Sequence, residues 1–146
     1  MKKPILRLAA ILVAASMAMG AFAVQAASKS FASHKVVLQI SDPNPFKQTL
    51  VLNVASNLIK YYGEDDIDVE IVAFGPGLRL LFQGNANKGR ITGLGAKGVR
   101  FSACSNTIRN MKKKHDIKLG SYAVKVKAGV VRILDLVKQG YVLIKP

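Results

Sequence analysis

Apolar and polar residues recur with two periods along the chain, and the changes of period predict its elements. Residues 35–40 (KVVLQI) form a short β-rich run that ends in a cluster of turn-forming residues. Over residues 50–62 the apolar positions return every three to four residues, which is typical of an amphipathic helix. Asn44 is a favourable cap for this helix. Pro45 suits its first position, because the donor that proline lacks would be unpaired there in any case.

The same alternation of strand and helix continues to the end of the chain. Further strands are predicted at residues 67–74, 99–103, 123–126 and 141–144, and further helices at residues 78–82, 105–114 and 129–138. Strands and helices that alternate with short connections predict an α/β layer fold with a mostly parallel sheet. We therefore expect one domain over residues 35–146 with about five strands, although the pattern leaves the order of the strands open.

Three details of the predicted helices are less certain than their positions. The segment 88–98 is a weak helix candidate, because three glycines interrupt it. Ser105 is the expected cap of the helix that follows the third strand. In the last helix we expect Arg132, Asp135 and Gln139 to mark a polar stripe on an otherwise apolar surface.

The first 26 residues have the pattern of a secretory signal peptide. Lys2 and Lys3 precede a charge-free apolar run over residues 8–24, and small residues lead to a predicted cut after Ala26. The alternative is an uncleaved membrane anchor, but the run lies at the short limit of what spans a bilayer. We therefore expect a periplasmic or secreted protein with no stable membrane span after cleavage. Residues 27–34 would form a short N-terminal extension.

Composition narrows the classes of protein. Half of the residues are hydrophobic, which is too many for a disordered chain. The single cysteine excludes an intramolecular disulfide and a cysteine-based zinc site. The formal net charge is +14, and loss of the predicted leader with its three basic residues leaves +11. This charge favours anionic partners in general. The chain has no recognised nucleic-acid motif, so we expect no nucleic-acid partner.

Two charged runs have ordinary structural explanations. An acidic cluster contains Glu64, Asp65, Asp66, Asp68 and Glu70. Its spacing does not match a calcium-binding loop, so we interpret it as a solvated turn and strand face. The basic run 112–115 (KKKH) lies at a predicted helix end, where cations complement the helix dipole. The alternative for this basic run is a surface that binds an anionic lipid or polymer. No metal site and no cofactor is predicted.

Cys104 is the candidate for chemistry, because it lies where the third strand ends and a helix begins. The backbone amides of Asn106 and Thr107 would point toward its sulfur, and Arg109 is near in sequence. A helix N-terminus lowers the pKa of a thiol and so favours a nucleophilic thiolate. The alternative is a buried cysteine that acts as a small hydrophobe, which is the commoner case.

Two loops join Cys104 among the places where ligand sites collect in such sheets, the carboxyl ends of strands. One contains Asn44, and the other is the turn Gly75, Pro76 and Gly77. Backbone amides of such a turn are able to cradle an anion. The turn lacks the phosphate-binding lysine and the full glycine pattern, so a plain tight turn is the favoured interpretation.

Four segments together resemble a known family. They are LNVASNL (52–58), VAFGPGL (72–78), GVRFSACSNT (98–107) and a tail with AGVVR (128–132) and QGY (139–141). In this order the segments resemble the DsrE/DsrF-like sulfur-relay family, and the exported single-domain branch in particular. The resemblance implies a three-layer α/β/α fold, homo-oligomers such as trimers or hexamers, and a sulfur-carrying cysteine that matches Cys104.

The resulting functional hypothesis is an exported sulfur carrier that holds a persulfide on Cys104. Asn106, Thr107 and Arg109 would stabilise the anion, and the loops with Asn44 and residues 75–77 would shape the pocket. Partners would be a sulfur donor or acceptor protein or a small sulfur species. Two alternatives stay open at this point. One is a non-catalytic periplasmic binding or oligomeric module for a small anion or a protein partner, and the other is the basic surface binder.

Overall fold

The computed structural model describes residues 28–29 and 31–146, and the predicted leader of residues 1–26 lies outside them. Strands and helices alternate through this part of the chain. The elements are β1 (His34–Ile40), α1 (Pro45–Tyr62), β2 (Ile67–Ala73), the 3₁₀ helix η1 (Gly75–Leu81), α2 (Lys88–Ala96), β3 (Arg100–Cys104), α3 (Ser105–Lys112), β4 (Ala123–Val126), α4 (Gly129–Lys138) and β5 (Val142–Ile144).

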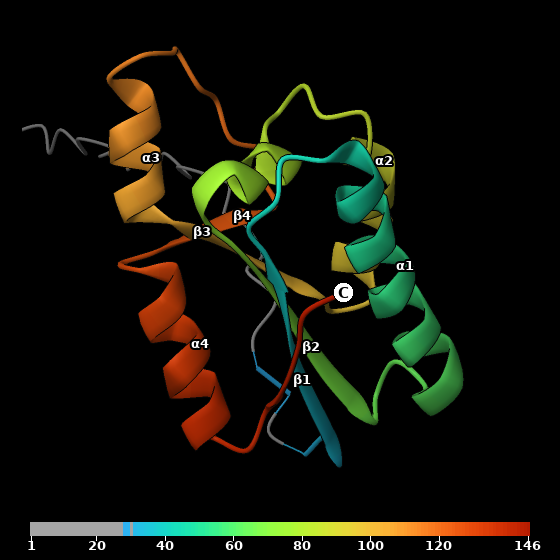
Figure 1. Ribbon diagram of the computed structural model, residues 1–146. Coiled ribbons are helices and arrows are strands. Elements are labelled where there is room, and N and C mark those ends of the chain that lie inside the picture. The colour runs from blue at the N-terminus through green and yellow to red at the C-terminus, as the bar shows by residue number, and fades with distance from the viewer. Residues whose placement is uncertain (1–27, 30) are drawn as a thin grey trace, which may run out of the picture.

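The strands form one parallel sheet in the order β4-β3-β2-β1-β5. The chain steps the same way from β1 to β4, and α4 then carries it back across the sheet to β5 at the opposite edge. Because parallel crossovers are right-handed, this reversal places α4 on the face opposite to α1 and α2. Figure 1 shows the three layers, with the sheet between α4 and the pair α1 and α2. The predicted three-layer α/β/α fold is confirmed.

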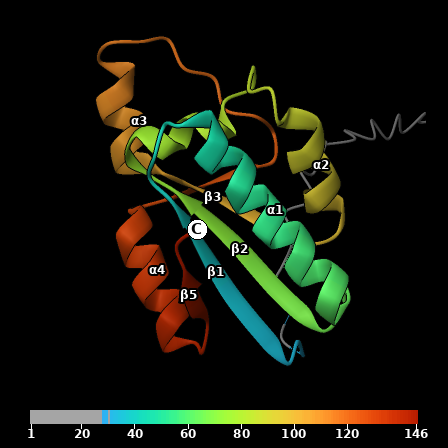
Figure 2. The ribbon, with the colours of Figure 1, turned by 45° about the vertical axis from the view of Figure 1, so that its right-hand side comes forward.

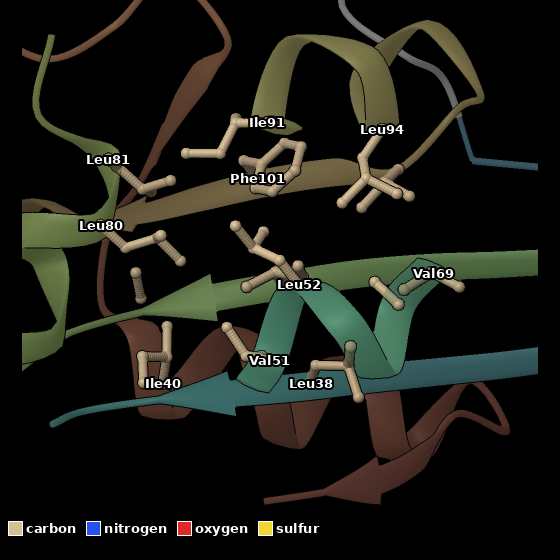
Figure 3. Close-up of a cluster of buried hydrophobic side chains, with 14 of the residues drawn as sticks. Leu38, Ile40, Val51, Leu52, Val69, Leu80, Leu81, Ile91, Leu94 and Phe101 are labelled. Carbon is tan, nitrogen blue, oxygen red and sulfur yellow. The ribbon is translucent and has the colours of Figure 1, made fainter. Parts of the chain in front are cut away.

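The face under α1 and α2 is apolar throughout. Alternate residues of β1 and β2 point into it, including Leu38, Val69 and Ile71, and all of them are buried. Leu52 of α1 and Phe101 of the neighbouring strand β3 belong to the same cluster, and in Figure 3 Leu52 lies between Phe101 and Leu38. Figure 2 shows α1 running along the strands on this side of the sheet. Apolar burial of this kind stabilises the fold without fixing the direction of any polar group.

The face under α4 carries a smaller apolar cluster and a set of buried charges. Its apolar part consists of Val37, Val72, Ile133, Leu136 and Tyr141, with Phe74 packed against it. Asp68 and Glu70 of β2 point into the same layer and are fully buried. The interpretation of these two carboxylates as a solvated strand face is therefore wrong. The alternation along residues 67–71 was correct, but α4 covers Glu70, and Ser28, Lys29 and Tyr141 cover Asp68.

Two arginines neutralise the buried carboxylates. Arg100 of β3 donates to Glu70 at 3.0 Å and also to Asp68. Arg132 of α4 donates to both oxygens of Glu70, each at 2.7 Å. Tyr141 donates to Asp68 at 2.6 Å, and every buried side-chain polar atom in the described part of the chain has a hydrogen-bond partner. Paired and hydrogen-bonded in this way, buried charges are tolerated.

The helices differ from the sequence predictions in three details. Residues 88–96 are helical despite their glycines, because Ile91 and Leu94 insert into the larger apolar cluster. Ser105 is the first residue of α3 and does not cap it, since Cys104 takes the cap position. The expected polar stripe of α4 is also wrong for Arg132, which faces the sheet, while four apolar residues of α4 are exposed: Val130, Val131, Leu134 and Val137.

Candidate functional site

Cys104 lies at the carboxyl end of β3 and belongs to the face of the sheet that α4 covers. Side chains alternate along a strand, so Arg100, Ser102 and Cys104 point to the same side. The charge network under α4 thus runs along β3 toward the cysteine, with Ser102 donating to Glu70 at 2.6 Å. Cys104 is also the residue that precedes α3. Its sulfur therefore lies between a buried polar layer and the start of a helix.

Several hydrogen-bond donors surround the sulfur of Cys104. Burial raises the pKa of this thiol, but the hydroxyl of Thr107 and the backbone amides of Thr107, Gly129 and Asn106 together outweigh burial. The pKa of Cys104 is consequently held below its ordinary value. Asn106 and Thr107 lie in the first turn of α3, whereas Gly129 is the first residue of α4. Two helix N-termini thus converge on one sulfur, and each favours the anion.

The hydroxyl of Thr107 is oriented by the turn that follows β2. The backbone amide of Gly75 donates to its oxygen at 2.9 Å, which leaves the hydroxyl proton available for the sulfur of Cys104. The amide of Gly77 is used as well, since it donates to the carbonyl of Ser41 at 3.0 Å. Pro76 has no amide proton. Both amides of the turn are therefore occupied, which favours the plain turn over an anion cradle and assigns to it the positioning of Thr107.

Two glycines hold the surrounding elements close together. A Cβ on Gly77 would lie 2.5 Å from the carbonyl oxygen of Ile40, so the turn packs against the end of β1 only with glycine there. A Cβ on Gly129 would lie 3.0 Å from the Cβ of Phe74 and 3.3 Å from the Cβ of Cys104. This close approach brings the amide of Gly129 to the sulfur. The sequence placed Gly129 at the start of the last helix, but the reversal of α4 to the other face is a long-range feature.

The remaining predicted site residues lie further from the sulfur. Arg109 donates to the side chain of Asn106, so its guanidinium is bonded to an exposed amide, and it does not contribute to the lowered pKa of Cys104. Asn44 is exposed, and its side chain accepts from the amide of Phe46 at 2.9 Å, as expected for a helix cap. Gly75 and Pro76 line an open groove of about 1540 Å³ together with Thr107, whereas Asn44 and Gly77 do not.

Cys104 is 5% exposed, while Asn106, two residues further on, is exposed. Within the described residues no group of three His, Cys, Asp or Glu side chains could hold a metal ion. In the same part of the chain, no helix combines the length and apolar character needed to cross a bilayer. The chemistry that the arrangement supports is that of a single thiolate held among amide and hydroxyl donors.

The fold and this site define an α/β protein with a cysteine at the carboxyl edge of a five-stranded parallel sheet. Neither a family model nor a curated protein matches the chain. Among solved structures, the chain is similar to MTH1491 from Methanobacterium thermoautotrophicum, a protein of unknown function. The two share 28% sequence identity with a TM-score of 0.69, and the match covers 77% of this chain and 99% of that one.

Proposed function

We propose that the chain is an exported DsrE-like protein that carries sulfur as a persulfide on Cys104. The observation that supports the proposal is the position of Cys104 at the start of α3 with the first residue of α4 beside it, where amides and the hydroxyl of Thr107 hold the pKa of the thiol low. A thiolate is the form of cysteine that attacks another sulfur, and donors that stabilise the anion increase its population at neutral pH. The resemblance of residues 98–107 to the DsrE/DsrF-like family supports the same assignment.

The transfer itself needs no metal and no redox cofactor. The Cys104 thiolate attacks the outer sulfur of a donor persulfide or polysulfide, and a new S–S bond forms while the donor's S–S bond breaks. The donor leaves as a thiolate with the electron pair of the broken bond and takes a proton from water. In the second half, an acceptor thiolate attacks the terminal sulfur of the Cys104 persulfide and releases Cys104 as the thiolate. One zero-valent sulfur atom moves, so electrons balance in each step.

The converging donors have a defined task in this proposal. A persulfide anion carries its charge one atom further from Cys104 than the thiolate does. The hydroxyl of Thr107 is held by Gly75 on one side of the sulfur, and the amide of Gly129 approaches from α4 on the other. Such preorganised donors stabilise the anion at both stages of transfer without rearrangement of the protein.

Assembly of several copies is part of the same proposal. The outer surface of α4 and the edge strand β5 expose large apolar side chains, namely Val130, Val131, Leu134, Val137, Val142 and Leu143. Six such residues on adjacent elements form an apolar surface of the kind that marks an interface. The resemblance implies trimers or hexamers, and α4 begins beside Cys104. Contact between copies through α4 would therefore lie next to the sulfur.

The low exposure of Cys104 favours a second candidate, a non-catalytic binding or oligomeric module for a small anion or a protein partner. In that case the cysteine is a small buried hydrophobe that completes the packing between Phe74 and Gly129. Cys104→Ala would then keep ligand binding and biological activity, whereas it abolishes both in a sulfur carrier.

The experiment that tests the proposal is intact-mass spectrometry after incubation with polysulfide. We expect a gain of one sulfur atom, about 32 Da, which a reductant removes. Cys104→Ser should show no gain, and it conserves the shape of the site. The proposal is wrong if the wild-type protein gains no sulfur or if the serine variant gains as much. Transfer of labelled sulfur from the loaded protein to a thiol acceptor would then test the second half of the reaction.

A further inference from the structure

A basic groove lies beside the cysteine site and shares Gly75, Pro76 and Thr107 with it, but its cations have no part in the proposed sulfur chemistry. It has a volume of about 1540 Å³ and runs between η1 with the loop that follows it and α3 with the segment 113–118. Five basic side chains line it: Arg79, Lys88, Lys113, Lys114 and Lys118. Asp116 is the one carboxylate among the lining residues of the described chain. The groove thus concentrates cations that the sequence distributes over three separate segments.

These five cations are available to a ligand. All five side chains belong to exposed residues, and none forms an ion pair with a carboxylate in the described part of the chain. Like charges gathered in a concave surface raise the local potential and attract an anion. Lys113 and Lys114 complement the dipole of α3, and this explains the presence of two of the five cations. It does not explain Arg79 and Lys88, which come from the opposite wall.

The floor of the groove is apolar and amide-rich. Ile117 is buried there, and Phe82 and Met111 are half-buried beside it. The side chains of Gln83 and Asn110 add amide donors and acceptors along the walls. A polypeptide has both apolar side chains and backbone amides that suit such a surface, in addition to carboxylates for the rim. The volume also exceeds the roughly 300–1,000 Å³ typical of pockets for small molecules.

Two other anionic partners fit this groove less well. Single-stranded nucleic acid is held by stacking of successive bases on aromatic side chains, and in the described chain the groove offers only the half-buried Phe82 and the imidazole of His115 for this. A lipid surface is flat on this scale and would touch the rim lysines without reaching Ile117 or Thr107 on the floor. We propose that the groove is a docking site for an acidic, partly apolar polypeptide segment of a partner protein.

The test is binding of a short fluorescent peptide of Glu, Ala and Leu residues to the purified protein, measured by anisotropy. We expect the double variant Lys113→Glu with Lys114→Glu to weaken binding at least about tenfold, because four units of charge change in the groove. The matched control is Lys60→Glu with Lys138→Glu. These lysines lie in the last turns of α1 and α4, so the control makes the same change of charge near helix C-termini, as Lys113 and Lys114 do at the end of α3.

Three further comparisons decide the class of partner. A peptide in which Ala replaces Leu should bind more weakly to the wild-type protein, and Met111→Gln should reduce that difference. Single-stranded DNA of equal charge and vesicles with anionic lipid should bind more weakly than the peptide at physiological salt. The inference is overturned if DNA or vesicles bind as tightly as the peptide, or if the groove variant loses no more affinity than its control. Cys104→Ser should bind the peptide normally, so this result and the sulfur experiment fail separately.

Discussion

The two faces of the sheet are built in opposite ways. Under α1 and α2 the buried side chains of the sheet are apolar, and the cluster extends from Leu38 on β1 to Phe101 on β3. Under α4 the same strands bury Asp68, Glu70 and Arg100. The first face is held by packing, which is strong but has no direction. The second is held by hydrogen bonds between charged groups, which fix distance and angle.

This difference matters for the position of Cys104. Arg132 ties α4 to Glu70 of β2 through two bonds of 2.7 Å, and Gly129 lies one turn earlier on the same helix. The charge network therefore sets where the N-terminus of α4 meets the sulfur. An apolar contact would let the helix slide along its axis more easily, because many packed arrangements have similar energy. The face that is held by hydrogen bonds of fixed distance and angle is therefore the one that carries Cys104.

The largest loss of stability is expected when Arg100 is replaced. Arg100→Met removes the cation shared by Asp68 and Glu70 and leaves two buried carboxylates with fewer partners. Breaking a buried ion pair from one side costs about 3–5 kcal/mol. We therefore expect the free energy of unfolding in urea to fall by about that amount at neutral pH. Leu52→Ala on the apolar face should cost a similar amount, about 2–5 kcal/mol, by leaving a cavity.

The dependence on pH separates these two variants. Burial raises the pKa of Asp68 and of Glu70, but hydrogen bonds from Tyr141 and Arg132 respectively, together with Arg100, outweigh burial and hold both pKa values below normal. Their stabilisation is therefore present above the pKa of the unfolded chain, about 4, and is lost as the pH falls through the folded pKa. The cost of Arg100→Met should shrink between pH 7 and pH 3, whereas the cost of Leu52→Ala should stay constant. An equal dependence in both variants would contradict the contrast between the faces.

The sequence predicted the apolar face better than the charged one. Periodicity, with the helix start at Asn44 and Pro45, placed α1 and the strands within a residue or two, because packing follows the pattern of apolar positions. The same pattern in residues 67–71 was interpreted as one solvated side. Arg100 and Arg132, which neutralise that side, lie about 30 and 60 positions further along the chain. The pairing became visible only with the strand order, which single-sequence patterns do not contain.

For the candidate site, the sequence likewise predicted the local contacts of Cys104 and missed the long-range ones. Asn106 and Thr107 are local to Cys104, so the strand-to-helix boundary was enough to propose their amides as donors. Gly129 and the link from Gly75 to Thr107 depend on elements brought together by the topology. Arg109 was expected to act on the sulfur because of its position in sequence, but its partner is the side chain of Asn106.

A smaller loss of stability is expected from Thr107→Val, which tests the hydrogen bonding of the α4 face at the sulfur of Cys104. The variant removes the hydroxyl that donates to Cys104 and accepts from Gly75 at 2.9 Å. A hydrogen bond to a charged group contributes about 1.5–3 kcal/mol, so the thiolate should become about tenfold scarcer or more. We expect the pH profile of alkylation by iodoacetamide to move to higher pH, with a loss of stability of about 1–2 kcal/mol.

Thr107→Ser is the matched control for this prediction. It retains the hydroxyl and loses one methyl group, so its alkylation profile should stay close to that of the wild type. A profile in Thr107→Val that coincides with that of Thr107→Ser would show that the hydroxyl does not stabilise the thiolate. Leu52→Ala should also leave the profile in place, because its cavity opens on the other face of the sheet.

The smallest effect on folding is expected on the outer surface of α4, where a large effect on assembly is expected instead. Leu134 is 55% exposed, so Leu134→Lys should change the free energy of unfolding of a monomer by no more than about 0.5 kcal/mol. If copies of the chain associate through this surface, burying a lysine there is unfavourable, and the oligomer should dissociate. Light scattering coupled to size-exclusion chromatography measures the mass of the wild-type protein and of Leu134→Lys.

The buried side of the same helix provides the control. Leu136 is fully buried against the sheet, so Leu136→Ala should destabilise the fold by about 2–5 kcal/mol while leaving the outer surface intact. At a concentration where both variants remain folded, only Leu134→Lys should lower the mass. A wild-type protein that runs as a monomer, or a Leu134→Lys variant that assembles as the wild type does, would contradict association through α4. The inner side of α4 would then hold the helix on the sheet through hydrogen bonds of fixed direction, and its outer side would form no contact with another copy.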